Sequence, residues 1–211
     1  MLDRTVLKQA AKDRLQEKWG TAVIFAALYA LIAYGTGLIP KVSFLFTLFV
    51  TPILSYGMAW GFLELIRKDT LSINDLFEGF KQYPRALGLY WWRGLWLLLW
   101  TLLLVVPGVI RGLAYSQAFF ILSESPDVKV RDALKISIKM TEGYKWDLFV
   151  LGLSFLGWAL LCILTLGIGF LWLGPYICAV YAAVYVELKE RSLKSGVCTE
   201  EMFIGRTRTG N

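Results

Sequence analysis

An apolar stretch over residues 91–124, with Pro107 and Gly108 near its middle, constrains the fold of this chain more than any other feature. A helix crosses about 30 Å of hydrocarbon in roughly 20 residues, so the stretch is too long for a single crossing. It can form one kinked helix, a re-entrant loop, or two short spans that fold back on each other at the Pro-Gly pair. The choice among these three fixes the topology of the whole chain.

The composition indicates a membrane protein. Of the 211 residues, 57% are hydrophobic and 15% are aromatic, and the mean hydropathy is +0.56. These values exceed those of a soluble domain of this size. The first hydrophobic segment follows an amphipathic N-terminus and has no small-residue cleavage site, so we interpret it as an uncleaved anchor.

The residue types that are missing or badly spaced exclude several kinds of site. The chain has no histidine, which excludes a Ser-His-Asp triad, a His-ligated zinc ion and a His proton relay. Its cysteines, Cys162, Cys178 and Cys198, lack metal-ligand spacing, and we interpret them as buried apolar filler. We therefore expect no metal, no cofactor and no enzymatic activity. Without a nucleic-acid motif, the net charge of +6 points to anionic lipids of the inner leaflet.

Three amphipathic segments precede the apolar ones. The first covers residues 1–19, the second begins with a capping-box pattern at Ser72 and Asp75 and is stopped by Pro84, and the third begins at residues 125–127 and ends near Gly143. We expect all three to lie at the cytoplasmic surface of the membrane. Each places a Trp twelve residues after a hydrophobic-Lys pair, which fits either a threefold repeat or three independent interfacial anchors.

The distribution of cations decides the topology. All Lys and Arg residues except Lys41 and Arg111 fall in four segments: 1–19, 67–93, 129–145 and 189–208. The positive-inside rule places such segments in the cytoplasm. An even number of membrane crossings must then separate each cation-rich segment from the next. The central stretch must therefore cross the membrane outward and return to the cytoplasmic side.

The expected fold class is therefore an all-α integral membrane protein with both termini inside. Residues 1–190 form one multi-pass domain with six transmembrane helices as three hairpins, and residues 191–211 form a polar cytoplasmic tail. The central hairpin turns at Pro107 and Gly108. On the second span, Gly57 and Gly61 let another backbone approach closely. The six spans are expected at residues 20–38, 43–66, 87–106, 108–123, 146–166 and 170–186.

Two long segments carry a resemblance to a known family. The sequences LLVVPGVIRGLAYSQAFFILSESPDVKVRDALKISIKMTEGYKWDLF and LSFLGWALLCILTLGIGFLWLGPY, with KWG at Lys18 and DLFEGF at Asp75, resemble a bacterial integral membrane family known as domain of unknown function number 975. That family is distantly similar to the membrane domain of some glycerophosphodiester phosphodiesterases. The resemblance implies a multi-pass protein of the bacterial plasma membrane, and it brings no catalytic residues.

Arg111 is the sharpest candidate for a ligand site. A cation just after the hairpin turn can bind a lipid phosphate, with Tyr115, Ser116 and Gln117 adding hydrogen bonds; alternatively, Arg111 only snorkels to the headgroups. A row of Trp92, Trp96 and Trp100 on one helix face suits either packing or ligand stacking. The expected interfacial anchors are Trp19, Trp91, Trp92, Arg93 and Trp146.

Two functions remain open on the sequence alone. The first is a non-enzymatic scaffold or accessory membrane subunit, with a membrane-protein partner or a second copy of the chain. The second is a small transporter or lipid-handling protein with a path near residues 107–117. A cavity that reaches Arg111 favours the second function, and a solidly packed core there excludes it.

Overall fold

The computed structural model describes residues 2–35, 40–165 and 167–204, apart from the side chains of 33–35, 40–47 and 105. Over these ranges the chain is all helical, with no strand. The elements in chain order are α1 (Arg4–Leu15), α2 (Trp19–Gly35), α3 (Pro40–Lys68), η2 (Ile73–Phe80), α4 (Tyr83–Leu103), α5 (Val105–Ala114), α6 (Ala118–Glu124), α7 (Val130–Met140), α8 (Lys145–Leu164), α9 (Phe170–Lys194) and α10 (Glu200–Phe203).

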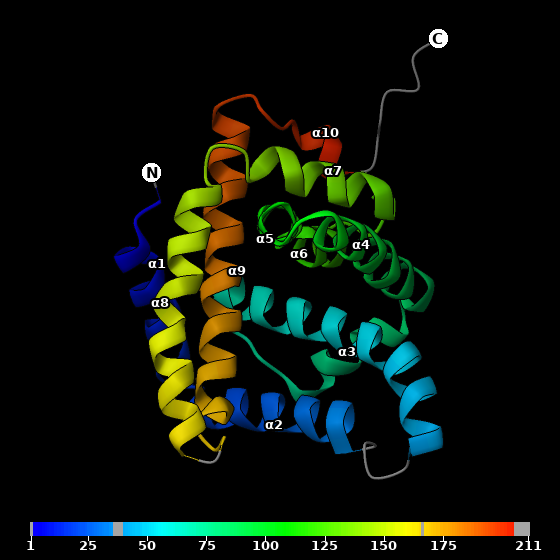
Figure 1. Ribbon diagram of the computed structural model, residues 1–211. Helices are drawn as coiled ribbons and strands as arrows, with labels where there is room; N and C mark the ends of the chain where they lie inside the picture. Colours follow the sequence, from blue (N-terminus) through cyan, green and yellow to red (C-terminus); the bar gives the residue numbers. More distant parts are fainter. Residues whose placement is uncertain (1, 36–39, 166, 205–211) are drawn as a thin grey trace.

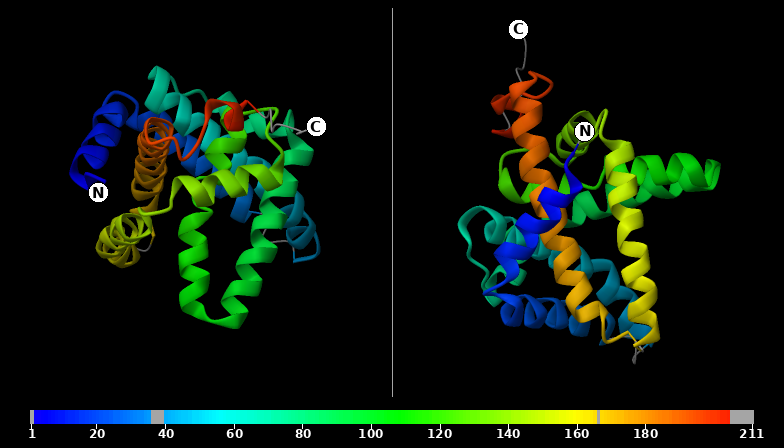
Figure 2. Two further views of the ribbon diagram at one scale, coloured as in Figure 1. Left: turned by 90° about the horizontal axis from the view of Figure 1, so that it is seen from above. Right: turned by 90° about the vertical axis from the view of Figure 1, so that its left-hand side faces the viewer.

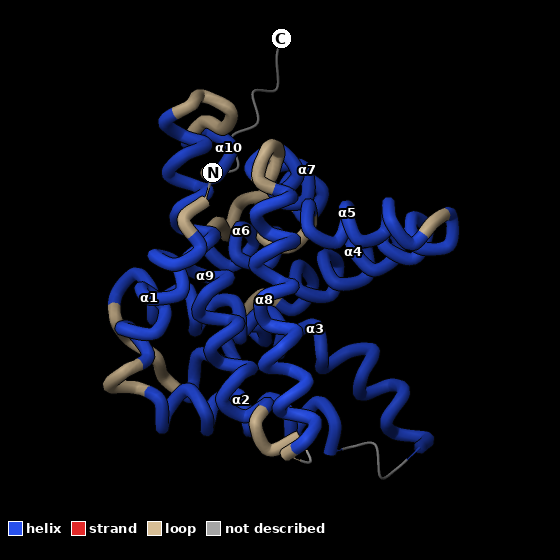
Figure 3. The backbone as a smooth tube through the Cα atoms, turned by 60° about the vertical axis from the view of Figure 1, so that its left-hand side comes forward, coloured by secondary structure: helices blue, strands red, loops and turns tan. Residues whose placement is uncertain are grey.

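Two hairpins dominate the arrangement. Helices α8 and α9 stand antiparallel along the long axis of the molecule, with α1 beside them and α2 running crosswise at their lower end (Figure 1). The hairpin of α4 and α5 projects from the body of the molecule, crosswise to α8 and α9 (Figures 2 and 3). The start of α1 and the end of α9 lie at the same end of the long axis (Figure 1).

The central stretch, residues 91–124, contains a hairpin, so the alternative of a single kinked helix is wrong. Helix α4 ends at Leu103, Leu104 is extended with φ −162° and ψ 142°, and α5 starts at Val105. The chain thus reverses three residues before the expected turn. Pro107 lies in the first turn of α5, where its missing N–H costs nothing.

Gly108 has a packing role instead of a turn role. A Cβ on Gly108 would lie 2.5 Å from the Thr101 hydroxyl and 3.0 Å from the Thr101 Cα. Only a residue without a side chain allows α5 to approach α4 this closely. The Pro-Gly pair therefore starts the return helix and packs it, while Leu104 makes the turn.

Six complete crossings are not supported. In the described part of the chain, three helices are long and apolar enough to span a membrane: Leu48–Lys68, Lys145–Leu164 and Phe170–Lys194. The apolar part of α2, Trp19–Ile32, is shorter. Helix α5 has ten residues, or about 15 Å at 1.5 Å per residue, which is half of the hydrocarbon thickness. The expected span 108–123 fails because the α-helix breaks at residues 115–117, between α5 and α6.

The amphipathic segments form helices, with some boundaries shifted. Helix α1 is capped by the Asp3 carboxylate, and η2 has the predicted capping box between Ser72 and Asp75. Pro84 is in the first turn of α4, so it starts that helix where we expected it to stop the previous one. Gly143 takes a φ of +83° between α7 and α8, which confirms it as the end of the third segment.

The core lies where α3, η2, α6 and α9 meet. The prediction that Gly57 admits a second backbone is confirmed, because a Cβ there would lie 2.0 Å from the Leu76 carbonyl oxygen of η2. Phe25 of α2 packs edge-on against Phe62 of α3, and both are fully buried. Beyond α9, Cys198 and Phe203 are also buried, so the expected tail is packed onto the body through α10. The end of the expected first span, residues 36–38, lies outside the described residues.

Candidate functional site

A groove with a tryptophan wall lies where α7 crosses the base of the α4–α5 hairpin (Figure 2). It has a volume of about 330 Å³. Helix α4 contributes a wall at i, i+4, i+8 spacing, which places the three rings on one helix face. We call it the Trp-Arg groove, and its lining residues are Trp92, Trp96, Trp100, Arg111, Tyr115, Arg131, Leu134, Lys135 and Ile138.

Two arginines stack on the ends of the tryptophan row. The Arg111 guanidinium of α5 lies 4.7 Å from the Trp100 ring centroid, and that of Arg131 of α7 lies 4.7 Å from the Trp92 ring centroid. Between them, Trp92 packs edge-on against Trp96. Such cation-π contacts contribute about 0.5–2 kcal/mol each and fix the orientation of the guanidinium.

The arginine donors remain free for a ligand. A guanidinium that stacks through its face still has its N–H groups in the plane, directed to the side. Among the residues that the structure describes, neither Arg111 nor Arg131 forms a hydrogen bond or an ion pair. The N–H groups of two guanidinium groups are therefore available to a ligand that lies along the tryptophan wall.

The electrostatic character of the groove is positive. Arg111, Arg131 and Lys135 line it, and no acidic side chain is among its lining residues. Asp132, next to the groove on α7, lies 3.7 Å from the exposed Lys135 ammonium group as an i, i+3 pair, and such pairs contribute little. An anionic group thus meets uncompensated positive charge.

The structure brings only two of the four predicted ligand residues to this groove. Arg111 and Tyr115 line it. Ser116 donates instead to the Leu113 carbonyl oxygen at 2.8 Å, within the break after α5. Gln117 is fully buried, its amide nitrogen donates to the Ser116 hydroxyl at 3.0 Å, and its Oε1 has no hydrogen-bond partner in the described part of the chain.

The predicted anchors differ in their surroundings. Trp146 and Trp91 are exposed, as interfacial tryptophans are, and Trp91 Nε1 donates to the Leu48 carbonyl oxygen at 3.3 Å. Trp19 is half-buried beside α1. Arg93 lies over the Phe119 ring at 5.8 Å, and its buried Nε lacks a hydrogen-bond partner among the described residues.

Sequence reasoning missed Arg131 and Lys135. Both were counted as surface charges of an interfacial helix. Their i, i+4 spacing places them on one side of α7, next to the apolar face formed by Leu134 and Ile138. Which helix that side meets could not be read from the sequence, because the contact between α4 and α7 joins residues about forty positions apart.

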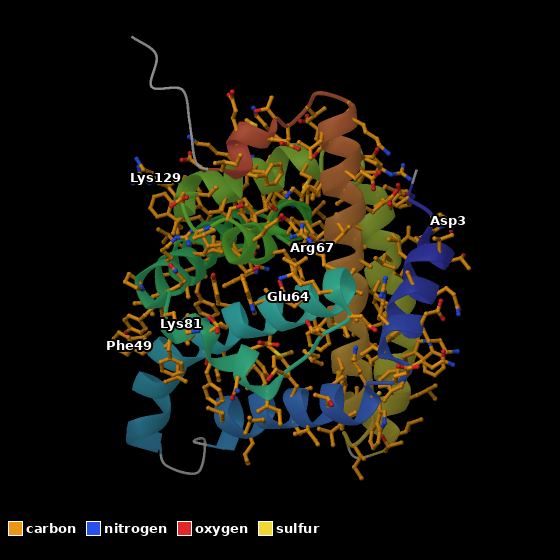
Figure 4. The ribbon with its side chains drawn as sticks, turned by 180° about the vertical axis from the view of Figure 1, so that it is seen from behind. Asp3, Phe49, Glu64, Arg67, Lys81 and Lys129 are labelled. Carbon is orange, nitrogen blue, oxygen red and sulfur yellow. The ribbon has the colours of Figure 1, made fainter. Side chains whose placement is uncertain are left out.

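A separate polar cluster joins α3, α6 and α9. The Glu124 carboxylate at the end of α6 accepts hydrogen bonds from Arg67 of α3 at 2.7 Å and from Tyr185 and Lys189 of α9. Figure 4 shows Arg67 in the centre of the molecule, near Glu64. Arg67 and Lys189 thus both form ion pairs with Glu124, whereas Glu64 pairs with Lys68.

The charges around Glu124 control its protonation. Burial by itself would raise the pKa of this carboxyl group, but the hydrogen bonds from Lys189 and Tyr185 and the nearby charge of Arg67 lower the pKa below its ordinary value. Glu124 is therefore ionised at neutral pH. We interpret it as a structural ion pair, since its acceptor oxygens already have partners.

Comparison with known families identifies the region that carries the groove. Residues 94–192 match the model of a family described as a protein of unknown function, DUF975. This part of the chain, somewhat less than half of its length, is similar to the DUF975 family. The DUF975 region runs from α4 into α9 and contains every lining residue of the Trp-Arg groove except Trp92. It confirms the family resemblance drawn from the sequence, whereas a similarity to glycerophosphodiester phosphodiesterases is not shown. No curated protein and no solved structure matches the chain.

Proposed function

We propose that this chain is a non-enzymatic, lipid-handling membrane protein that binds an anionic phospholipid in the Trp-Arg groove. The observation that carries the proposal is the pair of arginines, Arg111 and Arg131, which lie over the two end rings of the tryptophan wall and have no hydrogen bond or ion pair within the described residues. This arrangement joins the two parts of a phospholipid. The guanidinium forks suit the phosphate, and the tryptophan and leucine side chains suit the glycerol and the first methylene groups.

The charge of the groove favours an anionic headgroup over a zwitterionic one. Choline would bring a second cation close to Arg111, Arg131 and Lys135, where no carboxylate lines the groove. Phosphatidylglycerol has no such cation. Charge complementarity of this kind gives specificity more than raw affinity.

The test is lipid binding by the purified protein in neutral detergent. Phosphatidylglycerol should bind at least tenfold more tightly than phosphatidylcholine. The double variant Arg111→Gln/Arg131→Gln should lose that preference and about tenfold or more in affinity, because each hydrogen bond to a charged group contributes about 1.5–3 kcal/mol. The matched control is Lys129→Gln/Lys139→Gln, which removes the same charge from exposed positions near α7. Equal losses in both double variants would reduce the effect to net charge and overturn the proposal.

A second candidate function, a scaffold, is supported by one surface. Exposed apolar residues follow one face of α8 at alternating spacings of three and four, the pattern of a helix-packing seam. A partner helix or a second copy of the chain could cover it. Oxidation of a Leu156→Cys variant should then yield a disulfide-linked dimer in membranes, whereas a protein that only contacts lipid there would stay monomeric. The seam consists of Trp146, Phe149, Leu153, Leu156 and Leu160.

We also propose that both termini are cytoplasmic, in a bacterial plasma membrane. The positive-inside argument supports this orientation, as does the position of the start of α1 and the end of α9 at one end of the long axis. The α4–α5 hairpin would then enter the membrane from the cytoplasmic side without crossing it. A membrane-impermeant thiol reagent added outside should not label Val109→Cys in a cysteine-free background. External labelling would restore the six-crossing topology.

A further inference from the structure

A second groove, distant in sequence from the first, lies between α1 and the α8–α9 pair. One half is polar, with a volume of about 450 Å³, and its lining includes Arg4, Lys8, Lys12, Ser154 and Tyr176. The three cations are spaced at i, i+4, i+8 and so share one face of α1. Helix α1 is held against α8 at its start, because the backbone N–H of Leu2 donates to Asp147 at 2.9 Å.

The other half of this groove is apolar. It has a volume of about 560 Å³, and its lining includes Trp19, Trp158, Cys162, Trp172 and Leu173. Lys8, Lys12 and Tyr176 line both halves, so the two form one continuous groove. We call it the α1 groove.

All three helices change from polar to apolar in the same direction. On α8, Ser154 is followed at successive turns by Trp158 and Cys162. On antiparallel α9, Tyr176 is followed toward the same turn by Leu173 and Trp172. On α1, the cations are followed by Trp19 at the start of α2. The groove therefore has one basic end and one apolar end, and its apolar end lies toward the α8–α9 turn, where Gly169 lines it.

The cations of the α1 groove lack counter-charges. No acidic residue lines either half, and within the described residues none of the three cations forms an ion pair with a carboxylate. Lys8 lies over the Phe155 ring and donates to the Ser154 hydroxyl at 2.8 Å. Burial and the neighbouring charge of Arg4 lower the pKa of Lys8, as expected of a cation cluster without an anion.

From this geometry we infer that the α1 groove is a second binding site for an anionic phospholipid. Its phosphate lies among Arg4, Lys8 and Lys12, and one acyl chain runs along Trp158 and Trp172 toward the α8–α9 turn. The site is independent of the Trp-Arg groove, with which it shares no residue. A free phosphate would fill only the basic half, so the apolar half commits the site to a lipid.

The test counts retained lipids by native mass spectrometry of protein purified from phosphatidylglycerol-containing nanodiscs. Arg4→Gln/Lys12→Gln should retain one phosphatidylglycerol fewer than the unchanged protein, and Lys8 stays in place to keep its bond to Ser154. Trp158→Ala should also lose this lipid, since the exposed ring forms the wall for the acyl chain. Lys129→Gln/Lys139→Gln is the charge-matched control and should retain the full number. Circular dichroism and a monodisperse elution profile establish that each variant is folded.

Two outcomes would overturn the site. Unchanged lipid retention in both Arg4→Gln/Lys12→Gln and Trp158→Ala would show that no lipid depends on the groove. Displacement of the lipid by millimolar inorganic phosphate, with Trp158→Ala behaving as the unchanged protein, would assign the basic half to a free anion. When Arg4→Gln/Lys12→Gln is added to the Arg111→Gln/Arg131→Gln variant, one further phosphatidylglycerol should be lost. This result would distinguish the α1 groove from the Trp-Arg groove.

Discussion

The α4–α5 and α8–α9 hairpins are closed in the same way. In each hairpin, a glycine on the returning part of the chain packs against a residue with a small side chain that lies seven positions earlier. The pairs are Gly108 with Thr101 in the α4–α5 hairpin and Gly169 with Cys162 in the α8–α9 hairpin. A Cβ on either glycine would lie 2.5 or 2.6 Å from the facing side-chain atom and 3.0 or 3.1 Å from the facing Cα. The two turns are thus variations on one close approach.

The hairpins differ in length and in charge. The α8 and α9 legs have 20 and 25 residues, and no charged residue occurs over residues 148–186. The α4–α5 pair has legs of 21 and 10 residues and places Arg111 near its turn. A charge in hydrocarbon costs several kcal/mol unless it reaches a polar group. In the proposed function, the α8–α9 hairpin anchors the protein, whereas the α4–α5 hairpin stays near the headgroups and selects among lipids.

The largest expected effect comes from adding a charge to each hairpin. Leu156→Arg places a cation on the exposed face of α8, in the uncharged stretch, and should cost about 3 kcal/mol of insertion free energy. Leu98→Arg on α4 should cost less, because in the proposed arrangement the α4–α5 hairpin lies close enough to the headgroups for a long side chain to reach them. The measurement is the fraction of each variant that resists alkaline extraction from membranes, with Leu156→Met and Leu98→Met as controls. If Leu156→Arg and Leu98→Arg lost similar fractions from the membrane, the proposed difference between the two hairpins would be contradicted.

The shared closure predicts an effect of intermediate size. Gly108→Ala and Gly169→Ala should each destabilise the protein by about 2 kcal/mol, since the added methyl group overlaps backbone and side-chain atoms of Thr101 or Cys162. Gly94→Ala and Gly157→Ala are the matched controls, because both positions are helical and open, with nothing within 4 Å of the added Cβ. These two should stabilise the protein by up to about 1 kcal/mol. Thermal unfolding in detergent measures all four, and a neutral Gly108→Ala would mean that the α4–α5 legs are not closely packed.

The smallest effect concerns Glu124, which ties α6, the helix that follows the α4–α5 hairpin, to α9. Glu124→Gln should cost about 1.5 kcal/mol, the lower range for hydrogen bonds to a charged group. The pKa of Glu124 is lowered in the folded state. Its stabilisation is therefore complete above the ordinary glutamate pKa of about 4.3 and is lost as the pH falls through the lower folded value. Unfolding midpoints measured from pH 7 down to pH 3 should fall more steeply in the unchanged protein than in Glu124→Gln. Parallel curves would show that Glu124 does not carry this dependence.

Local patterns in the sequence were sufficient for much of the fold. The capping box at Ser72 and Asp75, the helical Trp row of α4 and the apolar lengths of α8 and α9 depend on neighbouring residues, and each is present in the structure. The reversal at Leu104 was displaced from the Pro-Gly pair because the turn needs only one extended residue. The Pro-Gly pair serves the helix start and its packing instead.

The candidate site was less accessible to sequence reasoning. Arg111 stood out because it is the lone cation of an apolar stretch, and Tyr115 followed from helical spacing. Arg131 reaches the groove only because α7 crosses the base of the hairpin, a contact between elements with no local signal. The short α5 was also missed, since hydropathy continues unchanged across the break at residues 115–117.

Photo-crosslinking in bilayers tests the contrast between the hairpins most directly. Diazirine-bearing phosphatidylglycerol and phosphatidylcholine of equal chain length are compared, and crosslinked peptides are mapped. We expect residues 92–115 to react preferentially with phosphatidylglycerol, and Arg111→Gln/Arg131→Gln to remove that preference without changing the crosslinks of residues 158–172. Equal reaction of residues 92–115 with both lipids, unchanged in the variant, would contradict a lipid-selective α4–α5 hairpin.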